Sequence, residues 1–146
     1  MRRNAIAFLL PLILVATVAV AAEPAGRVKN VAGKTILKSG TTSAPAKVGD
    51  AVAMGDVVET GADGSVGITF RDASRVSVGP NSKMVIDEFV FSPKTEDYGL
   101  TTRLQEGTLF YVSGLIAKLA PQNTSVATPD GTIGIRGTRL LVSVRK

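Results

Sequence analysis

The chain has 146 residues, a formal net charge of +5, and neither cysteine nor histidine. This composition excludes zinc sites built from cysteine and histidine, and it excludes Ser-His-Asp and Cys-His catalysis. The basic residues are scattered and aromatic residues are few, unlike the clustered basic and aromatic pattern of nucleic-acid grooves, so we expect no nucleic-acid partner.

Residues 1–22 have the parts of a secretory signal peptide. A short basic start is followed by uncharged residues 5–22, which end in small side chains. We expect cleavage after Ala22, which leaves a domain of residues 23–146, periplasmic or secreted, with no stable membrane span. The alternative is an uncleaved membrane anchor, because the apolar run approaches a spanning length. Pro11 and the small-residue end favour cleavage.

The rest of the chain alternates short β-branched runs with turn residues. Strand-like runs that recur about every ten residues, separated by Asp-Gly and Pro-Asn turns, predict an all-β domain. Residues 100–112 are interpreted as two strands around Glu106-Gly107, residues 113–118 as the best helix candidate, and residues 92–100 and 119–124 as loops. The other expected strands are 27–31, 35–38, 57–60, 65–70, 74–78 and 83–91.

The turn spacing suits a sandwich, a barrel or a solenoid. A short unit with a turn on each side favours stacked rungs. We therefore expect a single all-β domain that resembles a β-solenoid or β-helix, held together by packing alone because the chain has no cysteine.

From residue 26 to residue 144 the sequence resembles the FecR-type periplasmic domain. The resemblance lies in the order and spacing of several short landmarks. These are Gly55-Asp56, the Thr-Gly-x-x-Gly step (Thr60, Gly61, Gly64), the Asp-x-Ser turn (Asp72, Ser74), Gly79 to Ser82, the segment from Gly107 to Gly114, and the Thr-Pro-x-x-x-Ile-Gly-Ile-Arg-Gly-Thr block (Thr128 to Thr138).

The resemblance implies a β-rich, solenoid-like domain that lies outside the inner membrane. The best-known members relay a signal from an outer-membrane transporter to a sigma factor, through a cytoplasmic anti-sigma segment and a transmembrane helix. We find neither of those parts in this sequence, which is more similar to stand-alone secreted members. Members of the family usually continue with further strands after the Arg-Gly-Thr block, whereas here Arg139 to Lys146 follow.

The candidate site is Gly134, Arg136, Gly137 and Thr138. Two glycines three residues apart allow a positive φ angle or a close backbone approach. On the structural interpretation, Arg136 lies at a corner and pairs with a carboxylate, namely Asp130, Asp87 or Glu88. On the functional interpretation, Arg136 is an exposed contact for a partner or an anionic glycan. A bidentate guanidinium serves either role.

Other patterns indicate neither an enzyme nor a metal site, and we expect no cofactor. The Asp-Gly pairs are isolated, whereas a calcium loop needs several oxygen ligands at set spacing. Adjacent Asp87 and Glu88 should point to opposite faces of a strand, which argues against a carboxylate pair. The aromatic residues at strand positions are interpreted as core or half-buried packing: Phe70, Phe89, Phe91, Phe110 and Tyr111.

Two classes of function remain. The first is an interaction module that binds a protein partner in the cell envelope and relays a signal. The alternative is a cell-wall or glycan-binding module, for example on peptidoglycan, that uses Arg, Asn and Tyr side chains. Residues 139–145 are expected to form an exposed edge for a partner strand or a second copy of the chain, unless that strand is tucked beside residues 26–31.

Overall fold

The computed structural model describes residues 23–137 and 139–146. The expected signal peptide, residues 1–22, and the candidate site residue Thr138 lie outside the described residues.

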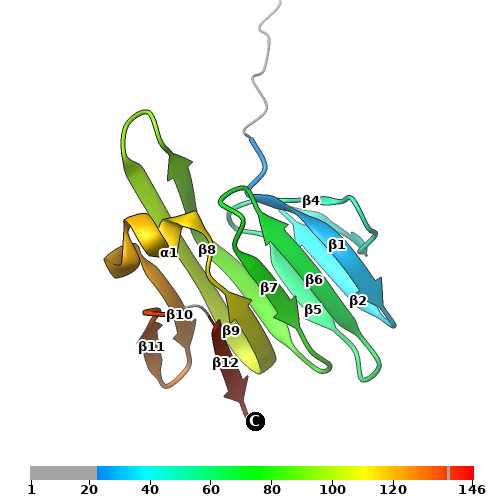
Figure 1. Ribbon diagram of the computed structural model, residues 1–146. Coiled ribbons are helices and arrows are strands. Elements are labelled where there is room, and N and C mark those ends of the chain that lie inside the picture. Colours follow the sequence, from blue (N-terminus) through cyan, green and yellow to red (C-terminus); the bar gives the residue numbers. More distant parts are fainter. Residues whose placement is uncertain (1–22, 138) are drawn as a thin grey trace, which may run out of the picture.

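The described residues form a mostly β fold with one short helix, which confirms the all-β prediction (Figure 1). Helix α1 spans Leu115–Leu119, which overlaps the expected helix at 113–118 and ends one residue later, and a 3₁₀ turn follows at Pro121–Asn123. The strands are β1 (Gly26–Ala32), β2 (Thr35–Ser39), β3 (Thr42–Pro45), β4 (Ala51–Val52), β5 (Val57–Thr60), β6 (Ser65–Phe70), β7 (Arg75–Val78), β8 (Lys83–Ser92), β9 (Asp97–Val112), β10 (Thr124–Thr128), β11 (Gly131–Gly134) and β12 (Arg139–Val144).

The strands form one curled sheet with two wings that meet along β9. Wing A contains β4, β1, β6, β7, residues 107–112 of β9, and β12. Wing B contains β3, β2, β5, β8, residues 97–106 of β9, β10 and β11. Strand β9 crosses from one wing to the other, and Figure 1 shows the sheet curling over on itself.

The chain turns a corner each time it crosses from one wing to the other. Successive corners lie next to one another and are joined by backbone hydrogen bonds. The amide of Gly61 donates to the carbonyl of Lys34 at 2.8 Å, and the amide of Asn81 donates to the carbonyl of Gly61 at 3.0 Å. Gly107 makes the corner within β9 with a φ of +91°, where a Cβ atom would also collide with Ser82. Only glycine meets both demands, so this position sets where β9 bends.

A single hydrophobic core lies between the wings. The rings of Phe70 on β6 and Phe89 on β8 stack with their centroids 5.4 Å apart, which joins wing A to wing B. Tyr111 is also buried, Phe91 packs partly against the core, and Phe110 is 37% exposed. The expectation of core or half-buried aromatic residues therefore holds for four of the five, and Phe110 is the exception.

The expected solenoid of stacked rungs is not confirmed. Apart from β10 and β9, the strand pairs given for the described residues are antiparallel, and several of them are tight hairpins. Two local predictions were wrong. Residues 100–112 belong to one strand that changes partners at Gly107, and most of the expected 92–100 loop is strand, with a tight turn at residues 93–96.

Candidate binding surfaces

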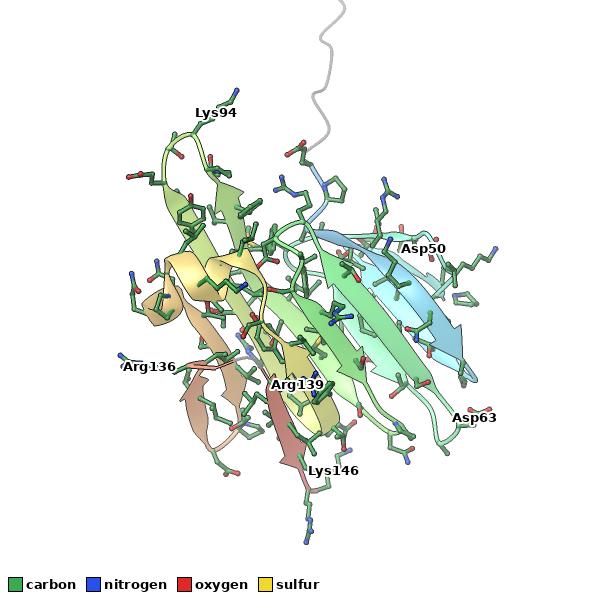
Figure 2. The ribbon with its side chains drawn as sticks, in the orientation of Figure 1. Asp50, Asp63, Lys94, Arg136, Arg139 and Lys146 are labelled. Carbon is green, nitrogen blue, oxygen red and sulfur yellow. The ribbon has the colours of Figure 1, made fainter. Side chains whose placement is uncertain are left out.

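Of the candidate site residues, Gly134 is the last residue of β11, and Arg136 and Gly137 lie between β11 and β12. Ile135 is buried and its amide donates to the carbonyl of Thr124 at 3.1 Å, which anchors the segment to β10. Arg136 is exposed and points away from the body of the protein (Figure 2). Gly137 has a φ of +140°, but no atom would lie near an added Cβ at Gly134 or Gly137. The close backbone approach that glycine allows is therefore not used at Gly134 or Gly137. It is used at the corners between the wings, as at Gly107.

The carboxylate that Arg136 would need is not supplied by Asp87. Both Nε and Nη2 of Arg103 contact Oδ2 of Asp87, at 2.9 and 2.8 Å. The ion pairs found among residues 23–137 and 139–146 do not include Arg136. None of the three candidate partners, Asp130, Asp87 and Glu88, forms an ion pair with Arg136 in this part of the chain, and whether Arg136 has a structural or a contact role stays a prediction.

Asp87 and Glu88 do not point to opposite faces, contrary to the expectation from strand geometry. The pairing of β8 with β9 shifts between Ile86 and Glu88, so that Asp87 is an extra residue in a β-bulge. Both acidic residues therefore stay on the outer side of wing B, while the residues before and after them, Ile86 and Phe89, are buried. The bulge is a tertiary feature that alternation along one strand does not reveal.

A buried hydrogen-bond network lies at the end of wing A. The sequence alone did not reveal that its residues contact one another. Oδ2 of Asp72 accepts hydrogen bonds from the Ser74 hydroxyl at 2.6 Å and the Ile116 amide at 3.1 Å, and Oδ1 accepts one from the Ser74 amide at 3.0 Å. The Ser74 hydroxyl also accepts from the Gly114 amide and lies 3.2 Å from the Tyr111 hydroxyl. The network ties the β6–β7 turn to the start of α1.

Burial raises the pKa of the Tyr111 phenol, and the nearby Asp72 carboxylate adds to the increase. Gly114 has to be a glycine here, because an added Cβ would lie 2.3 Å from the Ser74 backbone nitrogen. In the sequence, the Asp-x-Ser turn and the segment from Gly107 to Gly114 are separate landmarks, and these two landmarks contain the residues of the network other than Ile116.

The outer face of wing A has basic residues in a row across the strands. Arg27 is opposite Thr69, Thr69 is opposite Arg75, and Val112 lies between Arg75 and Arg139. Lys29 is also exposed on this face, at a bulge in β1. We call this surface, defined by Arg27, Lys29, Arg75 and Arg139, the basic face.

The basic face differs in charge from the outer face of wing B. The outward positions of wing A strands, within the part of the chain that the structure describes, include no acidic residue. On wing B, Glu59 pairs with Lys38 at 2.8 Å and with Lys83 at 3.4 Å, and these two lysines lower the pKa of Glu59. Positive charge is thus balanced on wing B and left unbalanced on wing A.

The comparison with known families decides the family of this chain. The sequence profile of the family described as FecR protein matches residues 56–146, which is more than half of the chain. The chain belongs to the FecR family. The predicted resemblance is therefore confirmed. No curated protein and no solved structure matches the chain.

The matched FecR region contains the Asp72 network and the strand β12, whereas β1 to β4 lie outside the match. The FecR family is linked to envelope signalling and is not known for enzymatic activity. Among residues 23–137 and 139–146, the structure contains no helix of the length and apolar character needed to cross a membrane.

In this FecR domain β12 pairs with residues 107–112 of β9 on one side. No strand pairs with its other side in the described part of the chain. The alternative that residues 139–145 are tucked beside residues 26–31 is wrong, because β1 pairs with β4 and β6. On the outer side of β12, Leu141 is 67% exposed and lies opposite Phe110.

Proposed function

We propose that this chain is a non-catalytic interaction module of the cell envelope, exported to the periplasm or secreted, that binds a protein partner in signalling. Membership of a family linked to envelope signalling supports the class of function. The observation that carries the proposed mode of binding is the free side of β12. A partner strand adds to this side through main-chain hydrogen bonds, which is β-augmentation.

Strand β12 is better suited to accept a partner strand than the edge strands β3, β4 and β11. Natural sheets protect their edges with short strands, prolines and charges. Strand β3 ends at Pro45, β4 has only two residues, and β11 begins and ends with glycine. Strand β12 has six residues, and its inward side chains Leu140, Val142 and Val144 pack at least partly against the core. It is therefore an ordered template with a free side.

The test places a photo-crosslinking amino acid at the exposed position Ser143 of β12 in living cells. The same substitution at Thr42 in β3 provides a control on another edge. We expect a crosslinked product with a protein partner from Ser143 and none from Thr42. A product with twice the mass of the chain would instead mean that the edge binds a second copy.

Two matched variants show whether the product depends on the edge. Leu141→Lys puts a charge on β12, and Val48→Lys makes the same change at a residue that is 66% exposed outside the strands. Both side chains are largely solvated, so each change should alter the free energy of unfolding by less than about 0.5 kcal/mol. We expect Leu141→Lys alone to abolish crosslinking. Equal crosslinking in both variants would contradict docking on β12.

A glycan-binding function is the second candidate, and the basic face is the observation that favours it. Of the side chains considered from the sequence for this function, the Tyr111 ring is unsuitable because it is buried in the core. Arg and Asn side chains are present on the outer face of wing A, where Asn30 lies beside Lys29.

A further inference from the structure

The basic face contains a polar groove that crosses the strands. A hollow of about 300 Å³ is lined by Lys29, Asn30, Thr69, Arg75 and Ser77. A second hollow of about 420 Å³ shares Lys29 and Thr69 with the first and extends to Arg27 and to the ion pair between Arg71 and Glu23. The two hollows together offer an elongated site rather than a single pocket.

Gly67 forms the floor of the first hollow. It lies opposite Asn30 on β1 and Ser77 on β7, and it faces outward at the centre of wing A. An added Cβ atom at Gly67 would lie 1.9 Å from Oδ1 of Asn30. The absence of a side chain at Gly67 therefore leaves room for the Asn30 amide, which lies in the groove as a hydrogen-bonding group.

The basic side chains are regularly spaced across the basic face, and Arg139 lies beyond the two hollows. Arg27 and Arg75 are separated by two strand spacings, as are Arg75 and Arg139, so that each pair is roughly 10 Å apart across the sheet. Arg27 uses one guanidinium nitrogen to donate to the carbonyl of Gly49 at 3.0 Å and keeps its other donors. A ligand with repeating negative charges matches this arrangement better than a single small anion.

A ligand on this face has to be recognised by side chains. Strands β6 and β7 each pair with strands on both sides, and β1 pairs with β6 on one side and with β4 at Gly26 and Arg27 on the other, so the backbone groups at the centre of this face are used within the sheet. An extended peptide laid across them would leave its own backbone groups without partners. A sugar chain instead presents hydroxyl groups, which match the Asn30, Thr69 and Ser77 side chains.

We propose that the basic face binds a linear anionic polysaccharide, whose carboxylate groups contact Arg27, Lys29, Arg75 and Arg139 while its hydroxyl groups contact the polar side chains of the groove. This inference rests on the glycan-binding function named above and does not require strand docking at β12. Loss of crosslinking from Ser143 and loss of polysaccharide binding are thus separate results.

The test is calorimetric titration of alginate, a linear polyuronate, into protein purified after expression of the full chain. Dextran is the uncharged control polymer. We expect alginate to bind, dextran not to bind, and the affinity for alginate to fall as salt is raised, because exposed charges are screened. Binding of poly-L-glutamate as tight as that of alginate would overturn the proposal, because the site would then recognise charge and not sugar.

Two double variants distinguish binding of alginate to the basic face from a general effect of the protein's net charge. Arg75→Gln/Arg139→Gln removes two positive charges from the face, and Lys94→Gln/Lys118→Gln removes two from exposed positions in the β8–β9 turn and α1. Figure 2 shows Lys94 at the tip of its hairpin, far from Arg139. We expect roughly tenfold weaker alginate binding for the first variant and no change for the second.

Equal weakening in the two double variants would overturn the proposal, because net charge alone would then explain binding. Unchanged binding in Arg75→Gln/Arg139→Gln would also overturn it. All four side chains are exposed, so both variants should retain the thermal melting temperature of the parent protein, and this is checked before titration. Preferential binding to vesicles of anionic phospholipid over alginate would assign the face to a membrane surface instead.

Discussion

Replacing Asp72 tests whether the buried network holds α1 on the sheet. The Asp72 carboxylate is fully buried and accepts hydrogen bonds from the Ser74 amide, the Ser74 hydroxyl and the Ile116 amide. In Asp72→Ala the two backbone amides lose their acceptor inside the protein. An unsatisfied buried donor costs about 1–3 kcal/mol, so the expected loss in the free energy of unfolding is about 3–6 kcal/mol, including a small cavity.

That loss is a large share of the roughly 5–15 kcal/mol that stabilises an ordinary domain, so Asp72→Ala could fail to fold. Asp72→Asn keeps the shape and one oxygen acceptor. If that oxygen keeps its hydrogen bonds with the Ser74 hydroxyl and the Ile116 amide, the new side-chain NH₂ group faces the backbone N–H of Ser74. Both groups are donors, so no hydrogen bond forms between them. The expected loss is about 1–3 kcal/mol, smaller than for alanine.

The assay is urea unfolding followed by far-ultraviolet circular dichroism. With a slope of about 1–3 kcal/mol per molar urea, the Asn variant should unfold at a midpoint lower by roughly 1 M. Asp130→Asn is the matched control, because Asp130 is exposed in the β10–β11 turn, and its midpoint should not move. A midpoint for Asp72→Asn equal to that of Asp130→Asn would refute the stabilising role of the network.

Hydrogen exchange provides a local readout of the same prediction. The Ile116 amide should exchange faster in Asp72→Asn than in the parent protein, because its acceptor is weakened from a carboxylate to an amide oxygen. Unchanged protection of this amide, together with a lowered midpoint, would mean that the variant acts away from α1.

Three further predictions concern other parts of the chain. Arg136→Ala should leave the melting temperature unchanged, because the Arg136 side chain is exposed; a loss of about 1–3 kcal/mol would instead reveal a buried carboxylate partner. The raised pKa of Tyr111 means that its contribution to stability is complete below the ordinary tyrosine value of 10.0 and disappears as pH rises through the higher folded-state pKa. Urea midpoints of the parent protein should therefore fall above pH 10 more steeply than those of Tyr111→Phe, and parallel alkaline limbs would contradict this. Mass spectrometry of protein recovered from the envelope or medium should find an N-terminus near Ala22 or Glu23, and an intact Met1 in a membrane fraction would refute signal-peptide cleavage.

The amino-acid sequence by itself determined the positions of most strands and turns. The expected runs 57–60 and 65–70 coincide with β5 and β6, and the run 83–91 differs from β8 by one residue. The reason is that period-two alternation and Gly, Asp and Pro turn residues act over a few neighbours along the chain. The FecR landmarks were recognisable for the same reason, since several of them are turns.

Tertiary structure alone decided how those pieces combine. Residues 100–112 looked like two strands because Glu106-Gly107 resembles a turn, yet Gly107 only bends β9 where its partner changes from β8 to β7. The bulge at Asp87 likewise depends on the register between β8 and β9.

The two proposed binding surfaces have the same origin. Arg27, Arg75 and Arg139 are scattered in the sequence, and they form a row only because β1, β6, β7, β9 and β12 pair in that register. Strand β12 is a free edge only because β9 occupies one of its sides and leaves the other open within the described part of the chain. Both features depend on long-range pairing between strands, which the local pattern of side chains does not encode.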